Sequence, residues 1–186
     1  MKKTALCLLA LLAFVPRENL YASQSDDPAK QAEELYTAGY LLTELGRYPE
    51  AIQFYLKSLA IRPTAEAYTF LGWTYGHLGV YEHAIEYAEK AIRTDPEYGN
   101  PYNDIGVYLI EQGKEDEAIP YLEKAKRAKR YCCYQFPYFN LGRIYIKKKQ
   151  YEKAREEFKK ALEIDPGYLP AREVLELLKV LDARES

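Results

Sequence analysis

The sequence predicts an all-α protein built as a solenoid of repeated helix pairs, and three observations lead to this fold class. Residue types recur with a period of about 34 residues, which is typical of stacked structural repeats. Small residues occupy fixed positions in each period, where two helices can approach closely. Tyrosine occurs 19 times in 186 residues, against one tryptophan and one methionine, which indicates that each repeat reuses the same aromatic side chain.

Four copies of the repeat can be aligned, beginning near Ala32, Ala65, Gly99 and Gln135. The second copy contains Tyr68, Leu71, Gly72, Tyr75, Gly79, Tyr81, Ala84, Ala88, Ala91 and Pro96. The last copy shows the same types at the same separations: Tyr138, Leu141, Gly142, Tyr145, Tyr151, Ala154, Phe158, Ala161 and Pro166. The third copy departs most, because it lacks the closing proline and has extra residues before the next copy begins.

Glycine and alanine positions predict how each helix pair is assembled. A glycine inside a helix costs about 1 kcal/mol relative to alanine, so its repeated use predicts close packing contacts at Gly72, Gly106 and Gly142. Small residues on the opposing helix play the matching role, at Ala51, Ala84, Ala118 and Ala154.

Helix ends are marked by a second set of residues. Glycine enters the left-handed C-terminal conformation without steric cost, which predicts that first helices end at Gly46, Gly79 and Gly113. Lys149 takes this position in the last copy and leaves the shape of that turn open. Asp-Pro pairs at 95–96 and 165–166 are predicted to close second helices, because proline blocks continuation.

These signals predict helices over 29–45, 48–61, 65–78, 81–94, 100–112, 115–131, 136–148 and 151–164. Residues 23–31 are interpreted as a polar tether and the start of the first helix. A ninth helix, over 169–183, is predicted to cap the array, as the end of a solenoid requires. Its leucines Leu175, Leu177 and Leu178 are expected to cover the last helix pair.

The pattern of these residues resembles the tetratricopeptide repeat family over nearly the whole chain after residue 22. The resemblance implies a right-handed superhelical solenoid of four helix-turn-helix units, 32–64, 65–98, 99–134 and 135–168, followed by a capping helix and tail, 169–186. It also implies that the first helix of each unit lines a concave groove that takes peptides or protein segments.

Side chains four residues apart share a helix face, and this spacing selects the residues expected to face the groove. They are Tyr36, Tyr40, Glu44, Thr69, Trp73, His77, Asn103, Val107, Glu111, Phe139, Arg143 and Lys147, with Asn140 beside them. Trp, Tyr and Arg dominate binding hot spots, and Asn103 and Asn140 offer donors and acceptors to a peptide backbone. Alternatively, Tyr36, Tyr40 and Trp73 pack against one another between adjacent first helices.

One subgroup of the family grips a C-terminal carboxylate with lysine, asparagine and arginine. Tyr36 and Tyr40 stand here where that subgroup has lysine and asparagine. The resemblance therefore does not extend to this activity.

The N-terminus predicts export. Lys2 and Lys3 precede an uncharged, mostly apolar run from Thr4 to Val15, which is typical of a secretory signal peptide and too short for a stable membrane span of about 20 residues. Cleavage is expected after Ala22, and the bacterial character of the segment indicates the periplasm. Removing residues 1–22 changes the net charge from −2 to −4, which argues against a nucleic-acid partner.

Cys132 and Cys133 are adjacent and leave three alternatives open: free thiols, a vicinal disulfide or a bond to another chain. They lack the Cys-x-x-Cys spacing of redox enzymes. His77 and His83 have the wrong spacing for a shared metal on one helix face. The sequence contains no assembled nucleophile, base and orienting group, so we expect no catalytic residues, no metal and no cofactor.

The sequence therefore predicts an exported, non-catalytic module that binds a protein or peptide partner in its groove, as an adaptor or assembly factor. The alternative is a structural oligomer that forms by repeat stacking or through Cys132 and Cys133. A thiol enzyme is the least favoured hypothesis.

Overall fold

The computed structural model describes residues 26–185, and the regular structure there is entirely helical apart from one isolated bridge between Tyr98 and Arg130. The helices are α2 (Pro28–Glu44), α3 (Tyr48–Ile61), α4 (Ala65–His77), α5 (Tyr81–Thr94), α6 (Asn100–Glu111), α7 (Glu115–Ala125), α8 (Gln135–Lys147), α9 (Tyr151–Ile164) and α10 (Leu169–Glu185). The predicted all-α fold is confirmed. The predicted signal peptide, 1–22, lies outside the described residues.

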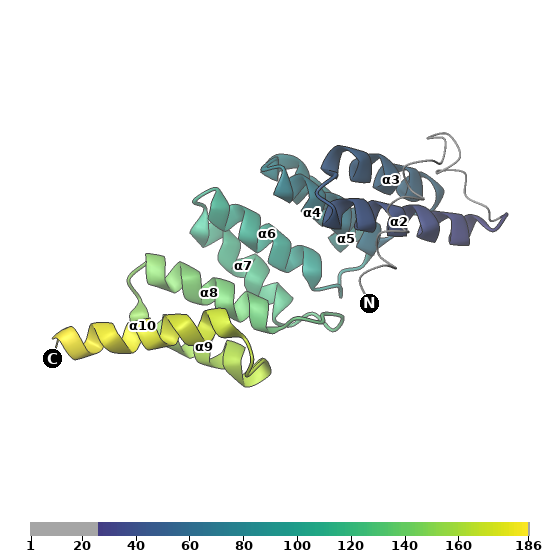
Figure 1. Cartoon of the computed structure of the whole chain (residues 1–186). Coiled ribbons are helices and arrows are strands. Elements are labelled where there is room, and N and C mark those ends of the chain that lie inside the picture. Colours follow the sequence, from purple (N-terminus) through teal and green to yellow (C-terminus); the bar gives the residue numbers. More distant parts are fainter. Residues whose placement is uncertain (1–25, 186) are drawn as a thin grey trace, which may run out of the picture.

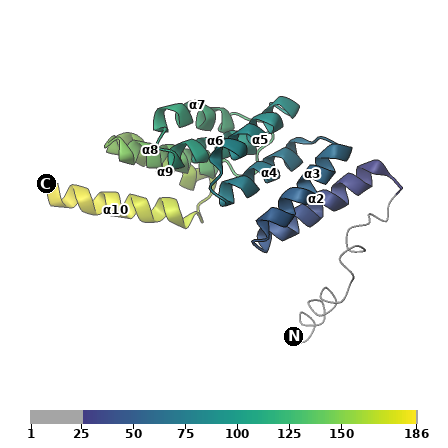
Figure 2. The same cartoon turned by 90° about the horizontal axis from the view of Figure 1, so that it is seen from above.

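Consecutive helices pack as pairs, α2 with α3, α4 with α5, α6 with α7, and α8 with α9, and each pair stacks on the next. Both cartoon views show the pairs following one another along an elongated array, with α2 and α10 at opposite ends (Figures 1 and 2). The first helices of the pairs also contact one another, α2 with α4, α4 with α6, and α6 with α8. A row of first helices therefore runs along the molecule.

Close approach inside each pair depends on the small residues that the sequence predicts. A Cβ atom added at Gly72 would lie 2.9 Å from the carbonyl oxygen of Ala84, and one at Gly142 would lie 2.5 Å from the ring of Phe158. Ala84 and Phe158 are fully buried. The predicted packing role of these glycines is confirmed.

The first helices that Gly46, Gly79 and Gly113 terminate all end in one turn type, with φ of 71°, 72° and 73°. Lys149 adopts the same left-handed conformation, with φ of 57°. The amides of Lys149 and Gln150 donate to Ile146 and Tyr145, as the corresponding amides do in the other turns. The turn therefore keeps its shape although a non-glycine residue pays a conformational cost there.

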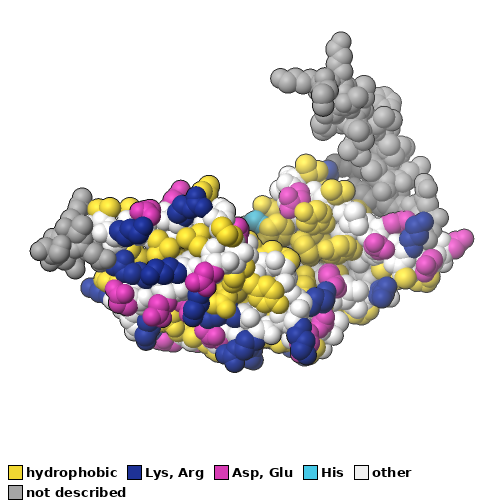
Figure 3. All heavy atoms as spheres, turned by 90° about the horizontal axis from the view of Figure 1, so that it is seen from below, with side chains coloured by type: hydrophobic (Ala, Val, Ile, Leu, Met, Phe, Trp, Pro, Cys, Tyr) yellow, Lys and Arg dark blue, Asp and Glu magenta, His cyan; other side chains and the backbone are white. Residues whose placement is uncertain are grey.

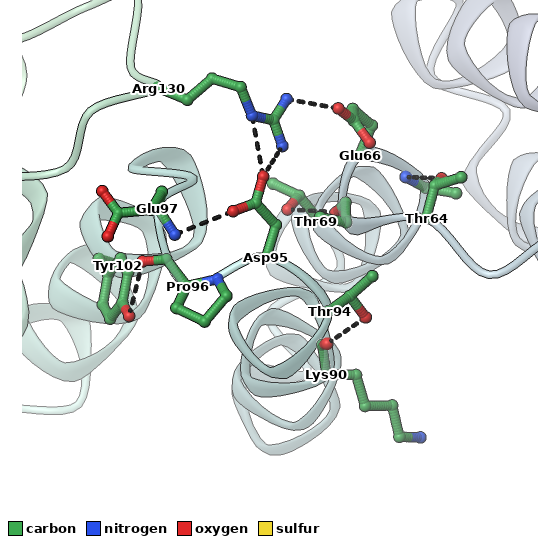
Figure 4. A network of polar contacts seen from close by, with 12 residues as sticks. Thr64, Glu66, Thr69, Lys90, Thr94, Asp95, Pro96, Glu97, Tyr102 and Arg130 are labelled. Atoms are coloured by element: carbon green, nitrogen blue, oxygen red, sulfur yellow. Dashed lines mark hydrogen bonds and ion pairs between the residues drawn. The ribbon is translucent and has the colours of Figure 1, made fainter.

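The predicted helix over 115–131 is wrong in its length, because α7 ends at Ala125. The chain after it pairs with the preceding repeat instead: the Gly99 amide donates to the Arg130 carbonyl, and the Arg130 amide donates to the Glu97 carbonyl, both at 2.9 Å. The Arg130 guanidinium bonds to Asp95 and Glu66 (Figure 4). The amides of residues 126–128 still donate back along the end of α7, whereas Arg130 exchanges helical hydrogen bonds for these tertiary ones.

Helix α10 covers the end of the array with a face that differs in part from the prediction. Leu178 is buried, and Ala171 is fully buried against the same cluster as Phe158. Leu175 is half-buried, whereas Leu177 is 64% exposed. Leu177 therefore lies on the solvent side, since one helical position away from Leu178 turns the side chain by about 100°.

Replacing Lys149 with glycine should stabilise the protein. The left-handed conformation costs a lysine about 1–2 kcal/mol in the folded state. Glycine removes this cost, but its greater freedom in the unfolded state offsets the gain by about 0.4–1 kcal/mol. We therefore expect Lys149→Gly to raise the free energy of unfolding by about 0.5–1 kcal/mol. The reciprocal Gly113→Lys, where a Cβ meets nothing within 4 Å, should lower it similarly. Urea denaturation measures both; equal stability of wild type and Lys149→Gly would contradict the argument.

Replacing Gly142 with alanine should destabilise the last helix pair. Alanine improves helix propensity by about 1 kcal/mol, but overpacking costs about 1–3 kcal/mol. The added methyl group would lie 2.5 Å from the ring of Phe158, which is fully buried. We expect a lower midpoint of thermal unfolding for Gly142→Ala. Phe158→Leu makes room for the added methyl group, so Gly142→Ala should cost less in that background. The same cost in both backgrounds would show that the glycine is not a packing contact.

Candidate functional site

A groove of about 460 Å³ lies across the first helices α4, α6 and α8. Seven of the predicted site residues line it: Trp73, His77, Asn103, Val107, Glu111, Phe139 and Asn140. Spacing of three and four residues places them on one face of each helix. We call this surface the central groove. A hollow with hydrophobic side chains and a histidine beside it is visible in the space-filling view (Figure 3).

The N-terminal side of the groove is an aromatic cluster centred on Phe70. The rings of Tyr36, Tyr40 and Trp73 meet Phe70 at centroid distances of 5.6, 5.4 and 5.9 Å, each in edge-to-face geometry. Trp73 also contacts His77. Tyr36 is half-buried and Tyr40 is 37% exposed. Much of the Tyr36 side chain is therefore used in packing between adjacent first helices, whereas the Tyr40 side chain stays partly exposed.

The two predicted asparagines contact each other at the floor of the groove. The Asn140 amide donates to Asn103 Oδ1 at 3.1 Å, and both side chains are buried. The Arg143 guanidinium donates to Asn140 Oδ1 at 3.3 Å. The Asn140–Asn103 bond joins α8 to α6, and both bonds use part of the hydrogen-bonding capacity that the sequence suggested for a peptide backbone.

Basic side chains at the C-terminal side are paired with acids of the preceding repeat. Arg143 bonds to Glu111 at 3.1 Å, and Lys147 pairs with Glu115. The Lys147 ammonium lowers the pKa of Glu115 from its ordinary value. The predicted basic end of the groove is therefore neutralised by carboxylates within the protein.

The remaining predicted residues lie at the edges. Thr69 is buried, and its hydroxyl donates to the Ala65 carbonyl at 2.8 Å within α4. It lines a smaller hollow of about 220 Å³ next to the groove, together with Trp73 and Cys133. Glu44 is exposed near the end of α2 and lies apart from the central groove.

Sequence reasoning missed several lining residues: Gly76, Tyr81, Asp104, Tyr108, Phe136 and Tyr168. Asp104 and Tyr108 each follow a predicted residue by one position on α6, and the choice of a single stripe excluded them. Phe136 and Tyr168 are brought to the groove by the segments around α8 and after α9. The aromatic period of the repeat marked Tyr81, which corresponds to Tyr48 and Tyr151, but it marked neither Tyr108 nor Phe136.

Asp104 is the chemically distinctive member of the groove. Burial raises the pKa of its carboxyl to about 7, although a hydrogen bond with Asn103 acts in the opposite direction. Among the described residues it forms no ion pair with a lysine or arginine. A carboxyl group in this environment changes charge near neutral pH.

Cys132 and Cys133 form a vicinal disulfide in the structure. They lie in the segment between α7 and α8, not at the end of a lengthened helix as predicted. Both sulfur atoms are used within one chain, so this arrangement leaves neither for a bond to a second chain.

Two features are absent from residues 26–185. No cluster of three or more His, Cys, Asp or Glu side chains there has the arrangement of a metal site. None of the helices in that range combines the length and apolar character needed to cross a membrane.

Known proteins share this architecture. Profiles of the tetratricopeptide repeat match residues 31–97, 67–131 and 136–168. The small glutamine-rich tetratricopeptide repeat-containing protein 2 of Saccharomyces cerevisiae is 31% identical over 111 residues, which are 58% of this chain and 32% of that protein. This chain thus spans about a third of the length of that curated relative.

Two solved structures have the same fold. The structure of MamA superposes with a TM-score of 0.63 at 28% identity, covering 71% of this chain and 77% of MamA. PilF of Pseudomonas aeruginosa gives a TM-score of 0.78 at 24% identity, covering 86% of this chain and 72% of PilF.

Proteins of this type act as protein-interaction modules and are generally non-catalytic. The repeat period, the helix pairs packed at glycines and the profile matches all agree. Tetratricopeptide repeats therefore make up residues 31–131 and 136–168 of this chain, which belongs to the tetratricopeptide repeat family.

Proposed function

We propose that this protein is exported to the bacterial periplasm and binds an extended segment of a partner protein in the central groove, as an adaptor or assembly factor. The groove itself carries the proposal. It has a volume of about 460 Å³, within the range of about 300–1,000 Å³ that is usual for binding pockets. It is lined by several aromatic side chains, which are frequent anchors at binding interfaces.

The position of Trp73 makes the proposal measurable. Trp73 is the only tryptophan in the chain, it is half-buried, and it lines both the central groove and the adjoining hollow. A segment that enters the groove changes the surroundings of its indole ring. Tryptophan emission therefore reports occupancy of this surface alone.

Filling the groove should abolish binding. We expect peptides selected from a displayed random library to change Trp73 emission, and Val107→Phe to weaken their binding by about tenfold or more because the ring occupies the groove. The matched control is Val80→Phe, since Val80 is exposed at the α4–α5 turn and does not line the groove. Titration by fluorescence gives both affinities. Peptides that leave Trp73 emission unchanged, or that bind Val107→Phe as well as wild type, would contradict the proposal.

Export is supported by the basic start and short apolar run of residues 1–22. We expect the tagged chain, produced in a bacterium, to begin at Ser23 when its N-terminus is determined by mass spectrometry of the periplasmic fraction. Leu11→Arg places a charge in the apolar run and should leave an uncleaved chain in the cytoplasm. An intact N-terminus on wild-type protein would refute export by this segment without affecting the groove.

A further inference from the structure

We infer that the central groove recognises a basic side chain, lysine or arginine, of the bound segment, which passes between the aromatic walls and pairs with the Asp104 carboxylate. This inference rests on the proposed function and adds the chemistry of the partner. It is carried by a carboxylate without a cationic partner, a hydroxyl without a hydrogen-bond partner and an aromatic lining, all in one groove.

Asp104 lies where the central groove and the adjoining hollow of about 220 Å³ meet, because it lines both. Within the protein, its carboxyl group forms a hydrogen bond with the Asn103 side chain. The nearby cations are used elsewhere: Arg143 bonds to Glu111, Lys147 to Glu115 and Lys148 to Asp116. The groove lining contains two carboxylates and neither lysine nor arginine. A cation from outside is therefore the charge that complements this surface.

Tyr108 supplies an independent observation. Its side chain is 5% exposed, and its hydroxyl oxygen has no hydrogen-bond partner in the described structure. Tyr108 is one helical turn from Asp104 on α6 and lines the same groove. A buried polar atom without a partner costs about 1–3 kcal/mol. An ammonium or guanidinium group carries several N–H donors and can satisfy the hydroxyl and the carboxylate together.

The walls of the groove suit the rest of a basic side chain. The Tyr168 ring meets the rings of Phe136 and Phe139 edge to face, at centroid distances of 5.7 and 5.2 Å. Trp73 lines the groove from helix α4. Aromatic ring faces attract lysine and arginine cations, and the methylene stems of these residues pack against apolar surface. The lining therefore favours both parts of the side chain.

Other occupants fit less well. An acidic side chain would meet the like charge of the ionised Asp104 carboxylate, while Glu111 is already paired with Arg143. A purely apolar side chain would cover the Asp104 carboxylate without pairing it, and a buried charge without a partner is strongly unfavourable. A basic side chain removes this penalty.

Burial raises the pKa of Asp104 to about 7, so peptide binding at this carboxyl should depend on pH near neutrality. A cation pairs with the ionised carboxylate, so binding of a basic peptide should strengthen as pH rises from about 5 to 8. Other titratable or charged groups line this region from each packed element: His77 from α4, Tyr81 from α5, Glu111 and Tyr108 from α6, Tyr131 before α8, Arg143 on α8, and Tyr168 after α9. Histidine also gains charge in acid, so Asp104→Asn is the control that isolates the carboxyl.

The test uses peptides selected from a displayed random library on the wild-type chain and titrated by Trp73 emission. We expect lysine or arginine at one position of the selected peptides. Replacing that residue with norleucine should weaken binding by about tenfold or more. Asp104→Asn should abolish the difference between the two peptides and flatten the pH dependence. Asp116→Asn removes the same charge from an exposed side chain outside the groove and should preserve both.

Separate outcomes address the two proposals. Some selected peptides could change Trp73 emission and lose affinity for Val107→Phe, yet lack a basic residue or prefer lysine over norleucine to the same extent on Asp104→Asn. That result would overturn this inference and leave the proposed function standing. Absence of any groove-bound peptide overturns both. Circular dichroism verifies folding of Asp104→Asn, and if that variant does not fold, the lysine-to-norleucine comparison on the wild-type chain decides alone.

Discussion

Close contact between the two helices of each pair is the constraint on which the rest of the structure depends. Where Gly72 faces the Ala84 backbone and Gly142 faces Phe158, a single added methyl group would collide. This contact fixes which face of each first helix is buried inside its pair. The opposite face is thereby directed to the row of first helices, where the central groove lies.

Polar contacts along this row set the character of the groove. Thr43 and Thr74 hydroxyls lie 3.1 Å apart between α2 and α4, and Asn103 and Asn140 join α6 to α8. Ion pairs from α8 to the preceding repeat add to these contacts. Individually, exposed ion pairs contribute little to stability. Their consequence is electrostatic, because they neutralise the basic side chains and leave Asp104 as a carboxyl without a cationic partner.

The segment between α7 and α8 shows how a departure from the repeat produces a local feature. Residues 126–131 have a composition compatible with helix, yet the helix ends before them. The backbone of Arg130 pairs with Glu97 and Gly99, and its side chain bridges Glu66 and Asp95. Bonds between residues far apart in sequence outweighed local propensity, as tertiary context often does. The same segment carries the vicinal disulfide and brings Cys133 to the hollow beside the groove.

The sequence alone determined the fold class, nearly all helix boundaries and the packing glycines, because each depends on local chemistry repeated in every copy. It also selected the helix faces that carry Trp73, Val107 and Phe139. Only the tertiary structure decided which charges remain unpaired and which aromatic rings meet at the groove. The surroundings of the Asp104 carboxyl depend on the positions of three separate helices, α4, α6 and α8. Lys149 takes a conformation typical of glycine because the surrounding turn imposes it. Such properties arise from contacts between repeats, which a one-dimensional period does not encode.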